Sequence, residues 1–206
     1  MTVLERRKRE FRQREGTVLA AALALFNRDD WQTVTIDQIA AKAEIGKGTV
    51  YKHFATKDEI YAKLVVSFQR SILAEFRKID LSQPPLRAIG ELIAVFWRTQ
   101  SRAPEHKRLI RYCRREDFHH VIGEKLSREL DELDEEMMSF LVPVIERGIR
   151  EGSIIAKPVA SVMLGLHAAM IGLMEMEGVE CMKTGLTAER QYEEVREFAL
   201  RGISRR

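Results

Sequence analysis

Residues 35–54 read TIDQIAAKAEIGKGTVYKHF, and this stretch predicts two short helices joined by a tight turn. Thr35 can cap the first helix, because Gln38 three residues later completes a capping box. The apolar residues that follow share one helical face: Ile36, Ile39, Ala40 and Ala43. The pattern is interrupted at Glu44-Ile45-Gly46 and resumes at Lys47. A second short helix is therefore expected to begin there.

This second helix carries side chains suited to a DNA groove. Val50 and Phe54 are four residues apart and are expected to pack inward. The remaining side combines positive charge, hydroxyl groups and aromatic rings, on Lys47, Thr49, Tyr51, Lys52 and His53. Such a helix, braced by a second one, is typical of a helix-turn-helix DNA reader. Gly48 costs about 1 kcal/mol in a helix relative to Ala, which is explained if its backbone approaches another surface closely.

The next helix also begins with a recognisable cap. Thr56 and Glu59 form a second capping box, and Lys57 lies in the first turn. Free backbone N–H groups beside a lysine suit a phosphate oxygen. The alternative is a small helical hairpin with a solvated basic face.

Residues 11–64 resemble the TetR (tetracycline-repressor-like) family of transcription regulators. Six residues match the core pattern of that family: Lys47, Gly48, Thr49, Tyr51, Phe54 and Lys57. Two positions depart from it, because Glu44 replaces the usual turn glycine and Gly46 replaces the usual capping serine. Glycine is still an acceptable N-cap.

The expected fold class is all-α, with about nine helices. Residues 1–56 are expected to form a three-helix DNA-binding domain that begins with a basic arm, residues 1–14. Residues 57–206 are expected to form a helical regulatory and dimerisation domain. The expected helices lie at Phe11–Asn27, Lys57–Ile79, Leu86–Gln100, Pro104–Arg115, Phe118–Arg150, Lys157–Met182 and Thr187–Ile203, besides the two short ones. Pro143 should kink its helix or leave one carbonyl unpaired.

Composition indicates a folded, globular chain. Of its 206 residues, 45% are hydrophobic and 32% charged, with a net charge of only +3. Residues 1–14 hold six Lys or Arg and two Glu, so this arm can add phosphate contacts or reach a minor groove. A solvated, disordered tail is the alternative. No apolar signal segment follows the start, and the uncharged stretch Val159–Met174 is too short to span a membrane, so we expect a cytoplasmic protein.

Two apolar helices near the C-terminus exceed the needs of one core. Lys157–Met182 is apolar nearly all round, and Thr187–Ile203 is amphipathic. The resemblance implies that they pair across a two-fold axis to form a homodimer. Two recognition helices would then read a pseudo-palindromic operator in double-stranded DNA. The alternative is a buried core helix in a monomer.

A ligand cavity in the second domain is implied mainly by the resemblance. The residues expected to line it are Phe68, Trp97, Tyr112, Met163 and His167. Aromatic and methionine side chains give an adaptable apolar wall, so a small hydrophobic ligand is expected. A carboxylate held by His167 or Tyr112 stays open, and so does plain core packing.

Catalytic and metal sites are not expected. Cys113, Glu116, Asp117, His119 and His120 are ligand types in one window, but their spacing matches no zinc pattern. The sequence contains no phosphate loop, nucleophile elbow or HExxH motif, and we expect no cofactor. The prediction is a DNA-binding transcriptional regulator and not an enzyme, most simply a repressor released by a small hydrophobic ligand. A helical enzyme and a ligand-independent DNA-binding or interaction protein are the alternatives.

Overall fold

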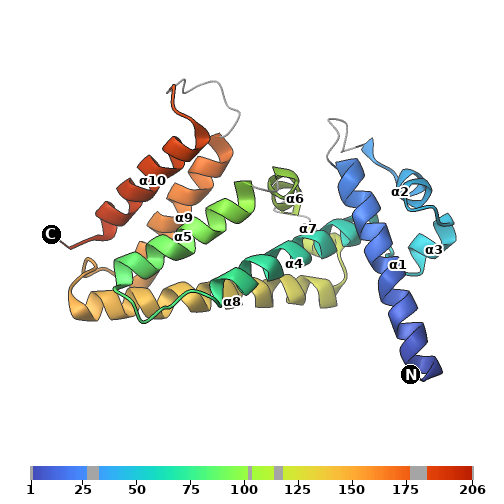
Figure 1. Ribbon diagram of the computed structural model, residues 1–206, viewed down its shortest axis with the longest axis horizontal. Coiled ribbons are helices and arrows are strands. Elements are labelled where there is room, and N and C mark those ends of the chain that lie inside the picture. The colour runs from blue at the N-terminus through green and yellow to red at the C-terminus, as the bar shows by residue number, and fades with distance from the viewer. Residues whose placement is uncertain (1, 27–32, 102–103, 114–117, 177–184, 206) are drawn as a thin grey trace. The chain divides into compact units, whose positions relative to one another are not determined.

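A computed structural model describes residues 2–26, 33–101, 104–113, 118–176 and 185–205, which are helical apart from turns and one isolated β-bridge. The helices of these residues are drawn in Figure 1. Their bounds are α1 Val3–Phe26, α2 Ile36–Lys42, α3 Lys47–Tyr51, α4 Lys57–Phe76, α5 Pro85–Ser101, α6 Pro104–Cys113, α7 Phe118–Val121, α8 Glu124–Glu151, α9 Val159–Met176 and α10 Ala188–Ile203. The all-α prediction is confirmed.

The chain divides into two compact units. The first contains residues 1–69 and 103–133, and the second contains residues 70–102 and 134–206. Both α4 and α8 therefore contribute residues to each unit. This division does not follow the predicted domain boundary at residue 56, because the first half of α4 is part of the unit that holds α1 to α3.

The first unit is built on α1, which packs against α2, while α2 packs against α3. Many apolar side chains of these helices, of the segment after α3 and of α4 are buried, among them Val18, Ala22, Phe26, Ile39, Val50, Phe54 and Ile60. Only the C-terminal half of α1 carries buried residues. The first half is an exposed helix, so the basic arm is helical from Val3 and is not an unstructured tail.

The second unit has one hydrophobic core formed by α5, α8, α9 and α10. Its members include Ile89, Ile93, Trp97, Ile145, Val162, Leu166, Met170, Tyr192 and Ile203. The helix α10 packs against both α9 and α5. The C-terminal end of α10 is fixed by a β-bridge between Ser204 and Ile154, and Ile154 follows the turn after α8.

Two helical predictions need correction. The single helix expected over 118–150 is interrupted at Ile122 and Gly123, where α7 ends and α8 begins. Glycine is unfavourable inside a helix, and here the chain uses it to break one. The first helix begins eight residues earlier than expected, at Val3 rather than Phe11. In contrast, α8 continues through Pro143.

Some predictions concern residues outside the described ranges. These include Glu116, Asp117 and Cys181, and the last six residues of the helix expected to end at Met182. Among the helices that are described, none has the length and the apolar composition that crossing a membrane requires.

Candidate nucleic-acid interface and ligand-binding residues

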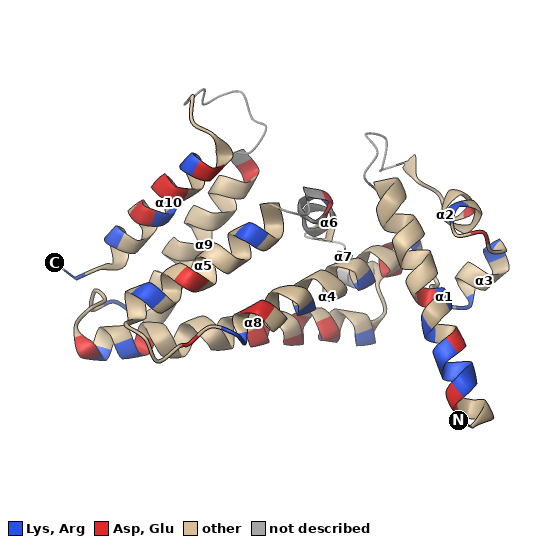
Figure 2. Ribbon diagram, in the orientation of Figure 1, with Lys and Arg blue, Asp and Glu red and all other residues tan. Residues whose placement is uncertain are grey.

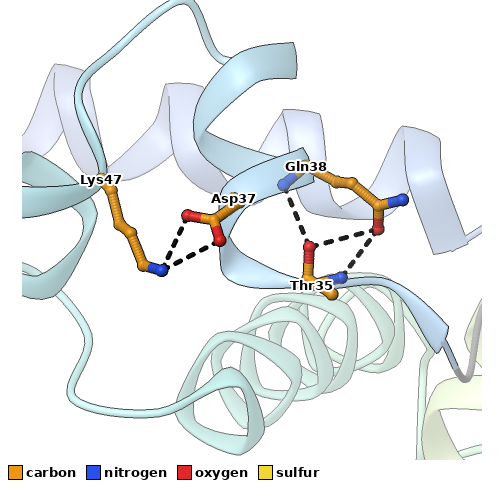
Figure 3. Close-up of polar contacts among 4 residues, drawn as sticks. All are labelled: Thr35, Asp37, Gln38 and Lys47. Carbon is orange, nitrogen blue, oxygen red and sulfur yellow. Dashed lines mark hydrogen bonds and ion pairs between the residues drawn. The ribbon is translucent and has the colours of Figure 1, made fainter.

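The start of α2 is fixed by the predicted capping box, shown in Figure 3. The Thr35 hydroxyl oxygen accepts a hydrogen bond from the backbone N–H of Gln38 at 3.3 Å. The Gln38 side-chain oxygen accepts one from the backbone N–H of Thr35 at 2.8 Å. Two otherwise unpaired N–H groups are satisfied in this way, so the first helix of the motif has a defined beginning.

The turn between α2 and α3 closes with two backbone hydrogen bonds. The N–H of Ile45 donates to the carbonyl of Ala40 at 3.0 Å, and that of Glu44 donates to Ala41 at 3.2 Å. This pair of bonds defines a Schellman motif, which places its central residue in the left-handed region. Glu44 accordingly has φ of 56°, the position where the TetR pattern has glycine. Gly46 caps α3 with no side-chain hydrogen bond, as its lack of a side chain requires.

The exposed face of α3 has the predicted composition. Val50 and Phe54 are buried, which turns the opposite side of the helix outward. Lys47, Gly48, Tyr51 and Lys52 are exposed, and Thr49 is half-buried. A Cβ atom placed on Gly48 would meet no other atom within 4 Å. Packing within the described chain therefore does not require glycine at this position.

One lysine of this face is held by an acidic residue of α2. The ammonium group of Lys47 lies 2.8 Å from a carboxylate oxygen of Asp37 (Figure 3). The hydrogen bond from Lys47 to Asp37 raises the pKa of the lysine above its ordinary value. Both side chains are largely exposed, so this ion pair is screened by solvent. It also places a negative charge beside the surface expected to meet DNA.

His53, at the end of the motif, contacts α1, the helix that contains the basic arm. Its ring lies 4.0 Å from the ring of Phe11 in α1, centroid to centroid. The Nδ1 atom is buried and has no hydrogen-bond partner in the described part of the chain. Burial lowers the pKa of His53 below its ordinary value, which favours the neutral ring.

Lys57 fixes the start of α4 to the segment before α2. Its ammonium group donates to the carbonyl of Val34 at 3.1 Å and lies 5.7 Å from the centre of the Tyr61 ring. The Thr56 hydroxyl accepts from the N–H of Glu59 at 3.1 Å, while the Glu59 carboxylate accepts from Ala55 at 2.7 Å. The predicted Thr56 cap is present, the Glu59 carboxylate accepts from Ala55, and Lys57 joins α4 to the segment before α2.

The N-terminal half of α1 adds a further basic surface. Figure 2 shows the blue positions concentrated in the N-terminal half of α1. Its basic residues are all exposed: Arg6, Arg7, Lys8, Arg9, Arg12 and Arg14. Arg6 pairs with Glu10 one turn later, at 3.0 Å.

The five predicted ligand residues fall in both units. Phe68 is buried in the first unit, and the Tyr112 hydroxyl there donates to Asp58 at 2.6 Å. In the second unit Trp97 is buried in the hydrophobic core, and Met163 packs against that core. His167 differs from the expectation, because its side chain is exposed. The helical period places it with Leu164 and Ala168 on the outer face of α9, opposite buried Leu166 and Met170.

A capped helix, a tight turn and a second helix with an exposed basic face define the helix-turn-helix class of DNA-binding proteins. The profile described as "Bacterial regulatory proteins, tetR family" matches residues 18–64, which contain this motif. The helix-turn-helix region of this chain is therefore of the type found in the TetR family of transcriptional regulators, which bind DNA through this motif.

Individual relatives agree with this assignment. The transcriptional repressor NicS of Pseudomonas putida is 28% identical over 141 residues, which are 66% of this chain and 63% of NicS. The structure of the ketosteroid transcriptional regulator KstR2 of Mycobacterium tuberculosis superimposes with a TM-score of 0.69 at 21% identity, covering 94% of this chain and 96% of KstR2. The structure of the regulator FadR of Bacillus subtilis, solved with stearoyl-CoA, superimposes with a TM-score of 0.72 at 15% identity, covering 91% of this chain and 98% of FadR. At these identities the two structures show the fold.

Two residues with distinctive environments were missed by the sequence analysis. The sequence did not indicate the ion pair of Asp37, because its partner Lys47 is ten residues away across a turn. Gln100 could have been recognised from the sequence pattern. It continues the buried face of α5 defined by Ile89, Ile93 and Trp97, and is the polar member of that row.

Proposed function

We propose that the protein is a homodimeric transcriptional repressor that binds a pseudo-palindromic operator and releases it when a small hydrophobic ligand binds. The observation that carries the proposal is α3, which buries Val50 and exposes Lys47, Tyr51 and Lys52. The names of NicS and KstR2 as repressors support the direction of regulation. The cytoplasm is the compartment that this role requires.

The motif residues have distinct proposed roles on DNA. Thr49 and His53 are nearest the base edges, while Tyr51, Lys52 and Lys57 act on phosphates. Lys47 adds phosphate affinity once it leaves Asp37, and Thr35 lies at the start of the bracing helix. The absence of a side chain at Gly48 leaves room for the DNA backbone. The exposed basic row of α1 contributes affinity without sequence preference.

Dimerisation is proposed through α9 and α10, which pack together in the second unit (Figure 1). Both helices expose large apolar side chains: Leu164 is 69% exposed and Phe198 is 79% exposed. Gly165 and Gly172 are also exposed on α9, and a Cβ at either would meet nothing within 4 Å. Small residues beside projecting apolar ones suit close packing against a second copy of the same helices.

Release of DNA is proposed to begin at α6. Tyr112 of α6 is joined to the start of α4 by its hydrogen bond to Asp58, and its ring meets the Tyr61 ring edge-on at 5.1 Å. Tyr61 in turn contacts Phe26 of α1, with ring centres 4.8 Å apart. A ligand that displaces α6 would thus shift α4 and α1, provided that it binds one arrangement more tightly than the other.

The decisive experiment selects fragments bound by the full-length protein from random double-stranded DNA. The expected result is an inverted repeat whose half-sites are about one helical turn, or a multiple of it, apart. Recovery of no enriched repeat would refute the proposal. Light scattering of the protein and of its DNA complex would give the number of subunits.

Variants then separate the two kinds of DNA contact. Tyr51→Phe should weaken all sequences alike by about 1 kcal/mol, the net value of one hydrogen bond. A change in the preferred sequence would contradict the phosphate assignment. Lys52→Gln should lower the salt dependence of binding by about one ion. Lys157→Gln is the matched control, since it removes the same charge at an exposed position before α9 and should leave binding unchanged.

A further inference from the structure

The interior of the second unit contains an amide group without a partner. Gln100, at the end of α5, is 0% exposed, and neither Oε1 nor Nε2 makes a hydrogen bond within the described residues. Burial removes the water that would otherwise satisfy these two atoms, and none of the described residues replaces it. Native proteins pair most buried polar side-chain atoms, so an orphaned amide requires a specific explanation.

A second buried polar atom without a partner belongs to the same unit. Tyr192 of α10 is 6% exposed, and its hydroxyl oxygen also lacks a hydrogen-bond partner in the described ranges. Its ring stacks on Trp97 with centres 5.0 Å apart and planes within 6°. Burial raises the pKa of Tyr192, so the phenol stays neutral and remains able to donate a hydrogen bond.

Helix register places Gln100 on the same side of α5 as Trp97. Gln100 follows Trp97 by three residues, which is nearly one helical turn along the same face. The helices α5 and α10 run antiparallel, because Arg196 donates to the Gly90 carbonyl while Trp97 meets Tyr192. Gln100 therefore continues the α5 row toward the beginning of α10.

Trp97 and Tyr192 belong to a hydrophobic cluster, and Arg196 and Arg98 lie close enough to act on the Tyr192 phenol. Their core cluster consists entirely of hydrophobic residues, among them Ile93, Val162, Leu166 and Met170. A few convergent polar groups in an apolar wall are the usual composition of a small-molecule site, where they orient the ligand.

We propose that Gln100 and Tyr192 are the polar recognition groups of the ligand site, and that the ligand is an apolar molecule bearing a neutral carboxamide or lactam. An amide group fits because Gln100 presents N–H donors and a carbonyl acceptor, and a ligand amide both accepts and donates hydrogen bonds. A carboxylate would leave Oε1 unpaired, because it accepts hydrogen bonds and donates none. This inference rests on the proposed ligand response and specifies its chemistry.

The first measurement uses the free protein. Gln100→Leu removes two unsatisfied atoms while keeping the approximate size of the side chain, so the melting temperature should rise. Thr99→Val is the matched control in the same turn, since the Thr99 hydroxyl already donates to the Val95 carbonyl at 2.9 Å. That control should not raise the melting temperature. A lower melting temperature for Gln100→Leu would mean that the amide is satisfied structurally, and would overturn the proposal.

The second measurement compares probes that share apolar bodies and differ in head group. The panel contains primary amides such as octanamide, lactams with a fused ring, their N-alkylated forms, and the matching carboxylates and amines. Binding is followed by thermal shift and by Trp97 fluorescence in a Trp31→Phe background. Primary amides or lactams should bind best, and Gln100→Leu and Tyr192→Phe should each weaken them by about tenfold while Thr99→Val does not. Equal binding of carboxylates, or no binding by any class, would show the assignment to be wrong.

Operator release by the same compounds is recorded separately. Amide binding that depends on Gln100 but leaves DNA bound would retain this site and refute ligand-induced release. Release of DNA by compounds whose binding is unaffected by Gln100→Leu would retain the proposed function and refute this site.

Discussion

The left-handed backbone at Glu44 predicts that Glu44→Gly stabilises the protein. Glu44 has φ of 56°, and its N–H and that of Ile45 are fixed by the turn after α2. A residue with a Cβ atom loses about 1–2 kcal/mol in this conformation relative to its preferred one, whereas glycine does not. Glycine gives back about 0.4–1 kcal/mol through the greater freedom of the unfolded chain. The net gain expected is therefore about 0.5–1 kcal/mol, or a rise in melting temperature of about 1–4 °C.

The assay combines thermal and urea unfolding followed by circular dichroism, with Glu44→Ala as the control. Alanine removes the carboxylate but keeps the Cβ atom, so its stability should remain close to that of the wild type. Equal stabilisation by both substitutions would assign the effect to charge, and a loss of stability in Glu44→Gly would refute the backbone argument. Operator affinity should change equally in both variants, because both remove the same charge from the motif.

Three further predictions concern the interface residues. Asp37→Asn removes the anion that pairs with Lys47 at 2.8 Å. Affinity for any DNA, measured by fluorescence anisotropy, should rise by about two- to fivefold at low salt and by less at high salt. Unchanged affinity would mean that Lys47 does not face DNA. Phe198→Glu places a charge on the exposed face of α10 and should yield monomers in light scattering with greatly reduced operator binding, and a persistent dimer would exclude this face. Burial lowers the pKa of His53, so on acidification the histidine is protonated in the unfolded chain before it is protonated in the folded one. The free energy of unfolding should therefore fall as the pH drops below about 6.5, and it should fall less in His53→Gln. Equal pH profiles of the two proteins would contradict this prediction.

Local interactions account for what the sequence by itself determined. Capping boxes, helical periodicity and the position of turns depend on residues three to five apart, so they can be read directly from the chain. The cap at Thr35 and the inward positions of Val50 and Phe54 were predicted and are confirmed. The same reasoning was less accurate over 118–150, because apolar periodicity continues across Gly123 although the helix does not.

Only the tertiary structure decided which side chains meet. The pairing of Asp37 with Lys47, and of Tyr112 with Asp58, depends on how separate helices pack, and no sequence spacing encodes it. The same is true of His167, which lies on the exposed face of α9 because the core contacts the other face of that helix. Gln100 shows the difference most clearly. The sequence places an amide on an apolar helix face, but only packing removes its water without a described residue supplying a partner, and this is the basis of the proposed ligand site.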